Sequence, residues 1–263
     1  MSSYRAQPGD GVVWITGASS GIGRAVALAL ARRGFTVVVS ARRAEALAEL
    51  VAEASAGKII TFPLDVGDPA ATRVAADEIE ARYGPIALAF FNAGVGSASR
   101  NTEIDADAFH ATYAVNVRGV VEGLAGLLPL MIARQHGQIA INASLVGYGG
   151  LPRTAAYGAS KAALINLAES LKFDGDRNNV TIQIVNPGFV DTAMTRRNNT
   201  SMPFLLTVED AAERVVRGFA RGGFEIAFPW PMALIVKFVS ALPYRLYFPV
   251  VAAITGWKRS KPN

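Results

Sequence analysis

TGASSGIG, residues 16–23, places three glycines within eight positions, directly after the apolar run GVVWI at residues 11–15. Glycine opens backbone conformations closed to other residues, but it loses more conformational entropy on folding than any of them. The apolar run predicts a buried strand, and GRAVALALARRG at 23–34 predicts a helix that ends at Gly34. The glycines therefore occupy a turn between a strand and a helix.

A glycine-rich turn in this context has a specific physical use. Glycine permits a tight turn, lets the backbone come close to a pyrophosphate, and lets the helix pack near the strand. The helix N-terminus then offers free N–H groups and the positive end of its dipole to phosphates. An ordinary turn is the alternative, since turns use glycine anyway. The strand before and the helix after favour phosphate binding.

The same alternation of apolar strands and helical segments continues along the chain. Strands are predicted at 11–16, 35–40, 58–63, 86–94, 137–144, 180–188 and 224–229. Helices are predicted at 23–34, 43–55, 68–84, about 105–134, 155–174 and 207–222. Strands apolar on both faces and separated by helices imply a parallel sheet covered on each side. Right-handed crossovers make this an α/β, Rossmann-like, doubly wound fold of about seven strands.

The composition supports one packed domain and excludes several kinds of site. The 263 residues are 51% hydrophobic and 18% charged, a balance that suits a core rather than disorder. No linker or repeat divides the chain, so residues 1–263 are predicted to form a single domain. The chain has no cysteine, which excludes disulfides and thiolate chemistry. His110 and His136 lack metal-ligand spacing, so no metal site is predicted.

The net charge helps to predict the binding partners, and the N-terminal sequence helps to predict the location of the protein. The formal net charge is +5, but the basic residues occur in scattered pairs and no nucleic-acid motif accompanies them. A small anionic ligand is therefore expected, and no nucleic acid. The N-terminal MSSYRAQPGD lacks the apolar core of a signal peptide, and no uncharged apolar run reaches the length of about 18 residues that a spanning helix needs. A cytoplasmic protein is expected.

Further motifs accompany the glycine-rich turn. With its TGxxxGxG spacing and six separated motifs, the chain resembles the short-chain dehydrogenase/reductase family over roughly residues 11–195. The motifs are Asp65-Val66, NAG at 92–94, Asn116, Ser144, Tyr157-x-x-x-Lys161, and NPG at 186–188 followed by Thr192. The resemblance implies an enzyme that transfers a hydride to or from a nicotinamide cofactor, and a homodimer or homotetramer built on the long helices.

The end of the second predicted strand indicates which dinucleotide binds. An acidic residue there commonly holds the ribose hydroxyls of NAD, whereas this chain has Ala41 followed by Arg42 and Arg43. A carboxylate would repel the 2′-phosphate of NADP, and a guanidinium binds it by charge-assisted hydrogen bonds. Solvated arginines are the alternative, but the helix dipole disfavours cations at a helix N-terminus. The pattern favours NADP(H) over NAD(H), with Arg42 the stronger ligand.

Tyr157 and Lys161 lie four residues apart on a predicted helix and therefore share one face. A free tyrosine has a pKa near 10, and an adjacent ammonium lowers it by stabilising the phenolate. Proton transfer is most efficient when the pKa of the catalyst lies near the working pH. A Tyr-x-x-x-Lys pair alone is common by chance and mostly structural. Here Ser144, at the end of the preceding strand, supports a catalytic interpretation of the pair.

The resemblance implies a role for each of four catalytic residues. Tyr157 donates a proton to the carbonyl oxygen in reduction or takes one from the alcohol in oxidation. Lys161 tunes Tyr157 and hydrogen-bonds the nicotinamide ribose, and Ser144 hydrogen-bonds the substrate oxygen. Asn116 holds a water that links Lys161 to solvent. An asparagine inside a helix is otherwise a mild liability, since its side chain competes for backbone hydrogen bonds.

Cofactor contacts also follow from the resemblance. Asp65 faces the adenine, Asn92 braces the cofactor loop, and Val190 and Thr192 hold the carboxamide. Asn186 is interpreted as a turn former beside Pro-Gly. The full cofactor set is Gly17, Ser19, Ser20, Gly21, Ile22, Gly23, Arg42, Asp65, Val66, Asn92, Ala93, Gly94, Tyr157, Lys161, Pro187, Gly188, Val190 and Thr192.

The substrate pocket is expected from loops that follow the strands, because loops at the carboxyl ends of strands line such clefts. Four residues make it apolar: Val146, Tyr148, Leu151 and Phe189. The polar stretch TRRNNTSMPFLL at 195–206 is consistent with a mobile lid. These features suggest a hydrophobic ketone or alcohol as substrate.

Residues from about 229 to 263 form a hydrophobic, predicted helical C-terminal extension outside the motifs. Its apolar segments are too short to span a bilayer, since they are interrupted by Lys237, Pro243, Arg245 and Pro249. Aromatic residues with the basic WKRSK end suit peripheral contact with a membrane. A helical pair that covers the pocket or a subunit interface uses the same apolar face. Both interpretations stay open.

Two functions from different classes are compatible with the cofactor site. The leading prediction is an NADP-dependent carbonyl reductase or alcohol dehydrogenase that moves a hydride between NADP(H) and a carbonyl or secondary alcohol. The alternative is a regulatory protein that binds NADP(H) without turnover. Loss of a reacting residue would favour the regulator, and Ser144, Tyr157 and Lys161 are all present.

Overall fold

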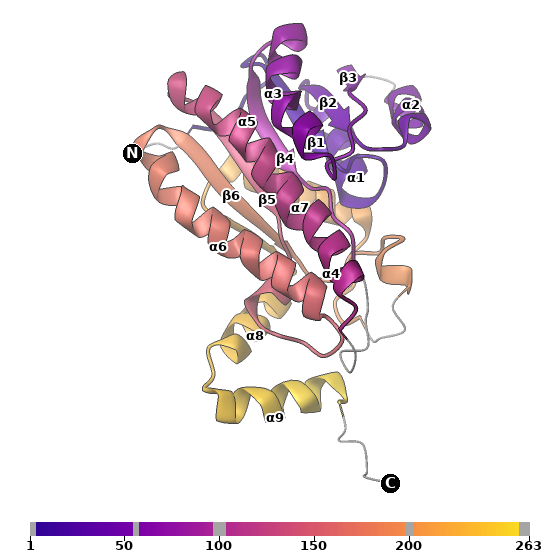
Figure 1. Ribbon diagram of the computed structural model, residues 1–263, viewed down its shortest axis with the longest axis vertical. Helices are drawn as coiled ribbons and strands as arrows, with labels where there is room; N and C mark the ends of the chain where they lie inside the picture. The colour runs from indigo at the N-terminus through magenta and orange to yellow at the C-terminus, as the bar shows by residue number, and fades with distance from the viewer. Residues whose placement is uncertain (1–3, 55–57, 97–103, 198–201, 258–263) are drawn as a thin grey trace.

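The computed structural model describes residues 4–54, 58–96, 104–197 and 202–257. One parallel sheet of seven strands has the order β3-β2-β1-β4-β5-β6-β7 (Figure 1). The strands are β1 Val12–Thr16, β2 Thr36–Ser40, β3 Lys58–Thr61, β4 Ile86–Phe91, β5 Gly137–Asn142, β6 Val180–Pro187 and β7 Glu225–Phe228. The doubly wound α/β prediction is confirmed.

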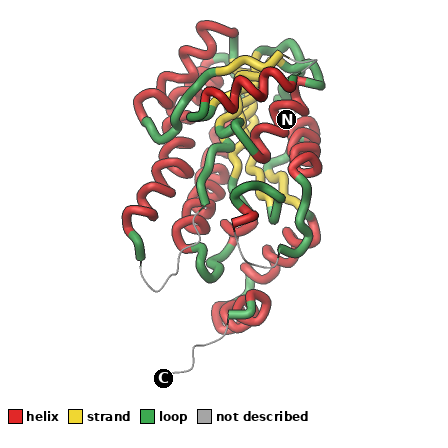
Figure 2. The backbone as a smooth tube through the Cα atoms, turned by 90° about the vertical axis from the view of Figure 1, so that its right-hand side faces the viewer, coloured by secondary structure: helices red, strands yellow, loops and turns green. Residues whose placement is uncertain are grey.

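Helices cover both faces of the sheet, which appears edge-on between them in Figure 2. The α-helices are α1 Gly21–Ala31, α2 Ala44–Glu53, α3 Pro69–Tyr83, α4 Ala106–Tyr113, α5 Gly119–Ala133, α6 Ala155–Arg177, α7 Val208–Arg221, α8 Trp230–Ser240 and α9 Tyr244–Thr255. Short turns named η1 Ala114–Arg118, η2 Leu145–Tyr148 and η3 Thr195–Arg197 complete the order. Two cores result, one on each face of the sheet.

Strand β1 supplies both cores because its side chains alternate between the two faces of the sheet. Val13 and Ile15 join the core beneath α1, α2 and α7. Val12 and Trp14 join the core beneath α3, α5 and α6. All five residues of β1 are buried, as its central position predicts.

The sheet order reverses at β1, which pairs with β2 on one side and with β4 on the other. In a doubly wound sheet the crevice outside the carboxyl ends of the strands at such a point is where ligands bind. The glycine-rich turn leaves β1 and the NAG segment leaves β4 at this point. The fold thus brings the two motifs to one edge.

The helix predicted over 105–134 is not regular. A π-helical turn, η1, separates α4 from α5 and contains Asn116. By length and composition alone the run Ala106–Ala133 could cross a membrane, with 44% of its most apolar window buried inside the domain. Leu124, Leu127 and Met131 of α5 lie in the core, which accounts for much of this apolar character.

Several predicted boundaries shift by a few residues. Strand β4 ends at Phe91 and β5 at Asn142, so Asn92 and Ser144 lie in the loops that follow. Helix α3 begins where predicted: Asp68 caps it by accepting from the N–H groups of Ala70 and Ala71 at 3.0 and 3.1 Å. Asn92 and Ser144 therefore lie just beyond the carboxyl ends of their strands, where ligands bind in such a fold.

Candidate functional site

The glycine-rich turn is shaped by the close approach of the loop that follows β4. Gly17 has φ +68° and Gly21 has φ +57°, conformations that favour glycine. A Cβ on Gly17 would lie 2.6 Å from the Cα of Ala93, and one on Gly23 would lie 2.4 Å from Nδ2 of Asn92. A side chain at either position would displace this loop.

Asn92 ties three strand ends together. Its Nδ2 donates to the carbonyl oxygens of Thr16 and Gly17 at 3.1 and 3.2 Å, while its Oδ1 accepts from Nδ2 of Asn142 at 3.0 Å. The Thr16 hydroxyl accepts from the backbone N–H groups of Asn92 and Ala93 at 3.1 and 3.2 Å. Asn92 thus holds the glycine-rich turn against the ends of β4 and β5.

The N-terminus of α1 has room for an anion. Among the described residues, no side-chain cap satisfies its first amides: Ser20 is the N-cap in extended backbone and its hydroxyl makes no capping bond. Helix N-termini with free amides bind phosphate. A Cβ on Gly21 would lie 3.3 Å from Cγ2 of Thr192, so the loop after β6 faces this turn. The residues present fit a dinucleotide pyrophosphate.

Two arginines follow the end of β2, where Ala41 is buried. Both Arg42 and Arg43 are exposed. Arg43 reaches the glycine-rich turn, since its Nη2 donates to Oγ of Ser19 at 3.4 Å. Sequence reasoning favoured Arg42 and did not single out Arg43, because two adjacent arginines look alike until the backbone orients them.

The Asp65-Val66 pair follows β3 and its residues face different surroundings. Asp65 is exposed, and its Oδ1 accepts from the N–H of Gly67 at 2.9 Å, which closes a local turn. Val66 is buried and packs against Gly119 at the start of α5, where an added Cβ would lie 3.0 Å from its Cβ. Only Asp65 is therefore accessible to a bound molecule through its side chain.

Ser144, Tyr157 and Lys161 meet at the carboxyl edge of the sheet. Ser144 follows β5, is buried, accepts from the N–H of Val146 and donates to the carbonyl oxygen of Pro187, both at 3.3 Å. Ser144 lies close enough to Tyr157 to lower the pKa of its phenol. The Nζ of Lys161 lies 5.7 Å from the centre of the Tyr157 ring. The first turns of α6 carry both of these residues.

Burial shifts both titratable groups. It raises the pKa of Tyr157 above its ordinary value, and the nearby Ser144 hydroxyl opposes this rise. It lowers the pKa of Lys161 to about 8. The Lys161 ammonium donates to the carbonyl oxygen of Asn142 at 2.7 Å. At neutral pH the phenol therefore holds its proton and the lysine its charge.

Asn116 in the π-helical turn is fully buried, and its side chain bonds to protein atoms. Its Oδ1 accepts from the N–H of Val95 at 2.7 Å, and its Nδ2 donates to the Val95 carbonyl oxygen and to Oγ of Ser160 at 2.9 and 3.0 Å. A Cβ on Gly94 would lie 3.4 Å from Oδ1 of Asn116 and 3.5 Å from Nζ of Lys161. Asn116 thus holds the loop after β4 beside Lys161. Its expected role in binding water stays a prediction.

Ser160 was not among the predicted residues. Its hydroxyl donates to the carbonyl oxygen of Tyr157 at 2.7 Å and accepts from Asn116. Its position immediately before Lys161 was the available signal. The bond chain Val95–Asn116–Ser160–Tyr157 links the loop after β4 to the helix that carries the tyrosine.

The predicted pocket residues divide into two groups. Val146, Leu151 and Phe189 are half-buried on the loops after β5 and β6. The hydroxyl of Tyr148 instead donates to Glu225 and accepts from Nδ2 of Asn186 at 2.9 Å. Tyr148 therefore anchors its loop to β6 and β7 through its polar end.

The interpretation of Asn186 as a turn former is wrong. Asn186 is a fully buried residue of β6, and its Nδ2 donates to Tyr148 and, at 3.0 Å, to Oε1 of Glu225. Glu225 also pairs with Lys237 of α8. A Pro-Gly pair follows the asparagine in sequence, but the strand continues through Pro187 because its partner β7 extends as far.

Two methionines that the sequence did not single out border the site. A Cβ on Gly96 would lie 2.9 Å from Sδ of Met194 and 3.9 Å from Cδ2 of Tyr157. A Cβ on Gly188 would lie 2.8 Å from Sδ of Met232 in α8. Flexible thioethers adapt to irregular apolar shapes, so these side chains suit the wall of an apolar pocket.

The loop after β6 is held at both described ends. The Thr195 hydroxyl donates to the carbonyl oxygen of Val190 at 2.6 Å and accepts from the N–H of Thr192 at 2.9 Å. Val190 also forms a parallel bridge with Leu206. Residues 198–201 of the predicted lid lie outside the described residues.

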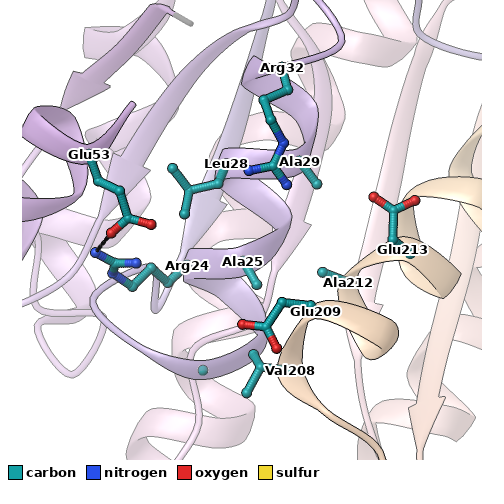
Figure 3. A pocket seen from close by; sticks show the side chains of 11 residues that line it. Arg24, Ala25, Leu28, Ala29, Arg32, Glu53, Val208, Glu209, Ala212 and Glu213 are labelled. Atoms are coloured by element: carbon teal, nitrogen blue, oxygen red, sulfur yellow. Dashed lines mark hydrogen bonds and ion pairs between the residues drawn. The ribbon is translucent and has the colours of Figure 1, made fainter. Parts of the chain in front are cut away.

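A separate cavity of about 290 Å³ lies between α1 and α7 (Figure 3). Charged side chains line much of it, among them the ion pair of Arg24 with Glu53. Of the predicted site residues it touches Gly21 alone. The reacting residues thus lie elsewhere, at the edge of the sheet.

Comparison with known proteins agrees with this geometry. The family model of the short chain dehydrogenases matches residues 11–203. An uncharacterised oxidoreductase of Myxococcus xanthus is 38% identical over 235 residues, which cover 89% of this chain and 93% of that protein.

Solved structures of the same type superpose closely. A short chain dehydrogenase/reductase from Burkholderia phymatum in complex with NAD has a TM-score of 0.80 at 26% identity, covering 98% of this chain and 99% of that one. A gluconate 5-dehydrogenase from Burkholderia cenocepacia in complex with NADP and tartrate has a TM-score of 0.77 at 25% identity, covering 86% and 96%. Together with the matched family model, these likenesses show that the chain is an oxidoreductase that belongs to the short-chain dehydrogenase family.

Proposed function

We propose that the protein transfers a hydride between NADP(H) and a hydrophobic ketone or secondary alcohol, with Tyr157 as general acid and base. The observation that carries the proposal is the convergence of Ser144, Tyr157 and the buried Lys161 at the same edge of the sheet as the glycine-rich turn. Two hydroxyls that converge there are suited to bind one substrate oxygen.

The nicotinamide, when bound, supplies or accepts the hydride. Ser144 donates a hydrogen bond to the substrate carbonyl oxygen and polarises it. Tyr157 gives that oxygen its proton in reduction and recovers a proton from the alcohol in oxidation. The charge of Lys161, close to the ring, stabilises the phenolate formed in reduction. Asn92 and Asn116 are positioning residues, since each orders a loop of the site.

The substitution Tyr157→Phe tests this mechanism, because it removes the hydroxyl and keeps the ring. We expect turnover to fall by about 10² to 10⁴-fold, the usual contribution of acid–base catalysis, with NADPH affinity retained. Tyr83→Phe at the end of α3 is the matched control and should leave turnover unchanged. Full activity in Tyr157→Phe would contradict the assigned role.

The preference for NADP(H) is supported by Ala41 in the place of an acid and by the arginines that follow it. Arg43 contacts Ser19 of the phosphate turn, so we extend the expected contact from Arg42 to both guanidiniums. Loss of a charge-assisted contact costs about 1.5–3 kcal/mol, so Arg42→Ala or Arg43→Ala should weaken NADPH about 10 to 100-fold and leave NADH unchanged. Arg32→Ala at the end of α1 is the control. Tighter binding of NADH than NADPH by the unaltered protein would overturn the preference.

The apolar pocket walls support a hydrophobic substrate. The predicted walls are Val146, Leu151 and Phe189, and the sulfur atoms of Met194 and Met232 lie near the site as well. A panel of ketones and alcohols of increasing chain length, assayed with both cofactors, tests this. Preference for small polar substrates would contradict it. A regulator without turnover is not favoured, because Ser144, Tyr157 and Lys161 come together in the structure.

A homodimer or homotetramer is supported by an apolar surface on the long helices. A groove of about 330 Å³ between α5 and α6 has an almost wholly apolar lining that includes Val121, Leu128 and Leu171. Val121 is 42% exposed. Val121→Glu should therefore yield a monomer by light scattering. Val74→Glu on α3, at 47% exposure, is the control that should leave the mass unchanged.

A further inference from the structure

Exposed apolar side chains gather on the two C-terminal helices. Nine of the 17 large exposed apolar residues in the described part of the chain lie between Trp230 and Trp257. On α8, Trp230, Leu234 and Phe238 recur every fourth residue and so share one face. On α9, Tyr244 and Phe248 stack at 5.7 Å. Apolar patches of this extent mark interaction sites.

Positive charge is also concentrated in the C-terminal extension. The sequence after Phe228 holds five basic residues, Lys237, Arg245, Lys258, Arg259 and Lys261, and no acidic one. The whole chain has 26 basic and 21 acidic residues, so the part up to Phe228 has 21 of each and is neutral. The net charge of +5 therefore belongs entirely to the extension.

Both helices pack against the loops of the reaction site. Helix α8 follows the carboxyl end of β7, and the Met232 sulfur lies against Gly188 after β6. The Tyr247 hydroxyl of α9 donates to the carbonyl oxygen of Gly150 at 2.9 Å, in the loop that leads from Ser144 to α6. In Figure 1 α9 lies beyond this end of the sheet, outside the helical layers. The apolar surface thus lies at the carboxyl end of the sheet, beside the loops that carry the reacting residues.

The dimensions exclude a spanning role for this pair and suit an interfacial one. Helices of 11 and 12 residues measure roughly 17 Å, about half of a bilayer core of roughly 30 Å. A second copy of this chain would bring the same positive charges together, whereas an anionic surface attracts them. Aromatic residues at both ends of the pair, Trp230 and Trp257, suit the interface between lipid headgroups and acyl chains.

We propose that α8 and α9 dock the protein on an anionic phospholipid surface, with the reaction site facing the bilayer. Docking requires neither cofactor nor turnover. Its consequence for the substrate rests on the proposed function: the ketone or alcohol is lipid-soluble and enters the site from the membrane.

Sedimentation with vesicles tests docking without any cofactor present. The full-length chain should bind vesicles of phosphatidylcholine with phosphatidylglycerol, and bind phosphatidylcholine alone more weakly. Phe238→Ser removes an aromatic ring that is 70% exposed and should lower binding to both about tenfold. Arg245→Glu should lower binding about tenfold or more on the anionic vesicles alone.

Matched controls separate docking from general effects. Val74→Ser on α3 removes an exposed apolar side chain elsewhere, and Lys58→Glu reverses a charge at the start of β3; both should bind like the unaltered protein. Melting temperatures check that every variant folds. Failure to bind anionic vesicles, or equal losses in the controls, would overturn the proposal. Self-association without lipid that Phe238→Ser abolishes would assign the face to a second copy instead. If the protein binds vesicles but turns over no ketone or alcohol, the docking proposal stands and only the proposed redox function is contradicted.

Discussion

Gly17→Ala is the substitution that tests most directly why the turn at residues 16–23 contains glycine. Gly17 has φ +68°, a conformation that costs a residue with a Cβ about 1–2 kcal/mol. The added Cβ would also lie 2.6 Å from the Cα of Ala93, and forcing apart a packed contact costs about 1–3 kcal/mol. The expected loss of unfolding free energy is therefore about 2–5 kcal/mol.

Gly34→Ala isolates the backbone contribution. Gly34 has φ +88°, but a Cβ there would lie 3.8 Å from Pro8, an ordinary contact. The expected loss is then about 1–2 kcal/mol. The difference between the two variants, about 1–3 kcal/mol, measures the clash between the glycine-rich turn and the loop after β4.

Urea unfolding followed by tryptophan fluorescence measures both variants. Trp14 is buried and bonds to Oγ of Ser40 at 3.0 Å, so its emission reports unfolding of the sheet, whereas Trp230 is 67% exposed and changes less. Gly17→Ala should also weaken NADPH binding, because the displaced loop lines the dinucleotide site. Equal destabilisation by Gly17→Ala and Gly34→Ala would refute the steric argument.

Three other predictions follow from groups around the site. The rate of reduction should stay constant from neutral pH to about 8 and fall at higher pH, where Lys161 loses its proton. The rate of oxidation should rise with pH, because burial raises the pKa of Tyr157 and its phenolate forms only at high pH. A reduction rate that climbs above pH 8 would contradict the role of Lys161. Burial alone would raise the pKa of Glu225, but hydrogen bonds, from Lys237 first, hold it below its ordinary value. A depressed carboxyl pKa gives stability above the unfolded value that is lost as pH falls, so Glu225→Gln should be less stable than the unaltered protein at neutral pH and lose less on acidification, as urea unfolding at both pH values will show. Asn92→Ala removes bonds to two carbonyl oxygens and should cost about 1–3 kcal/mol by the same assay, with Asn166→Ala on the exposed face of α6 near neutral.

Much of the fold follows from local patterns in the sequence. Strands apolar on both faces, helices with apolar spacing and a glycine-rich turn between the first two elements predicted the doubly wound parallel sheet. Boundaries were less accurate: β4 ends at Phe91 and not at residue 94. The strand ends where its partners end, and that is a tertiary property.

The regular helix predicted over 105–134 shows the limit of periodicity. Asn116 bonds to the backbone of Val95 and to Ser160, on segments distant in sequence, and the helix takes a π turn at this point. Such a turn leaves the apolar pattern on either side unchanged. Sequence alone therefore predicts one continuous helix.

Side-chain orientation was the other property that the pattern did not carry. Tyr148 was predicted to make the pocket apolar, which stays a prediction, and only the structure shows that its hydroxyl bonds to Glu225 and Asn186. Arg42 was favoured as the phosphate ligand, which stays a prediction, while the contact of Arg43 with Ser19 was not predicted. Each outcome depends on partners from other strands and loops. The spacing of residues along the chain does not show which of these distant segments will lie close together.

By itself, the sequence determined the doubly wound fold, the glycine-rich turn at 16–23 between a strand and a helix, and the set of Ser144, Tyr157 and Lys161, because these depend on residue type and on short-range spacing. Only the tertiary structure decided that Asn186 is buried in β6, that Asn116 interrupts its helix, and that α8 and α9 keep an apolar face exposed beside the site. Burial and hydrogen bonding join elements far apart in the chain, and packing of the whole domain selects which side chains meet.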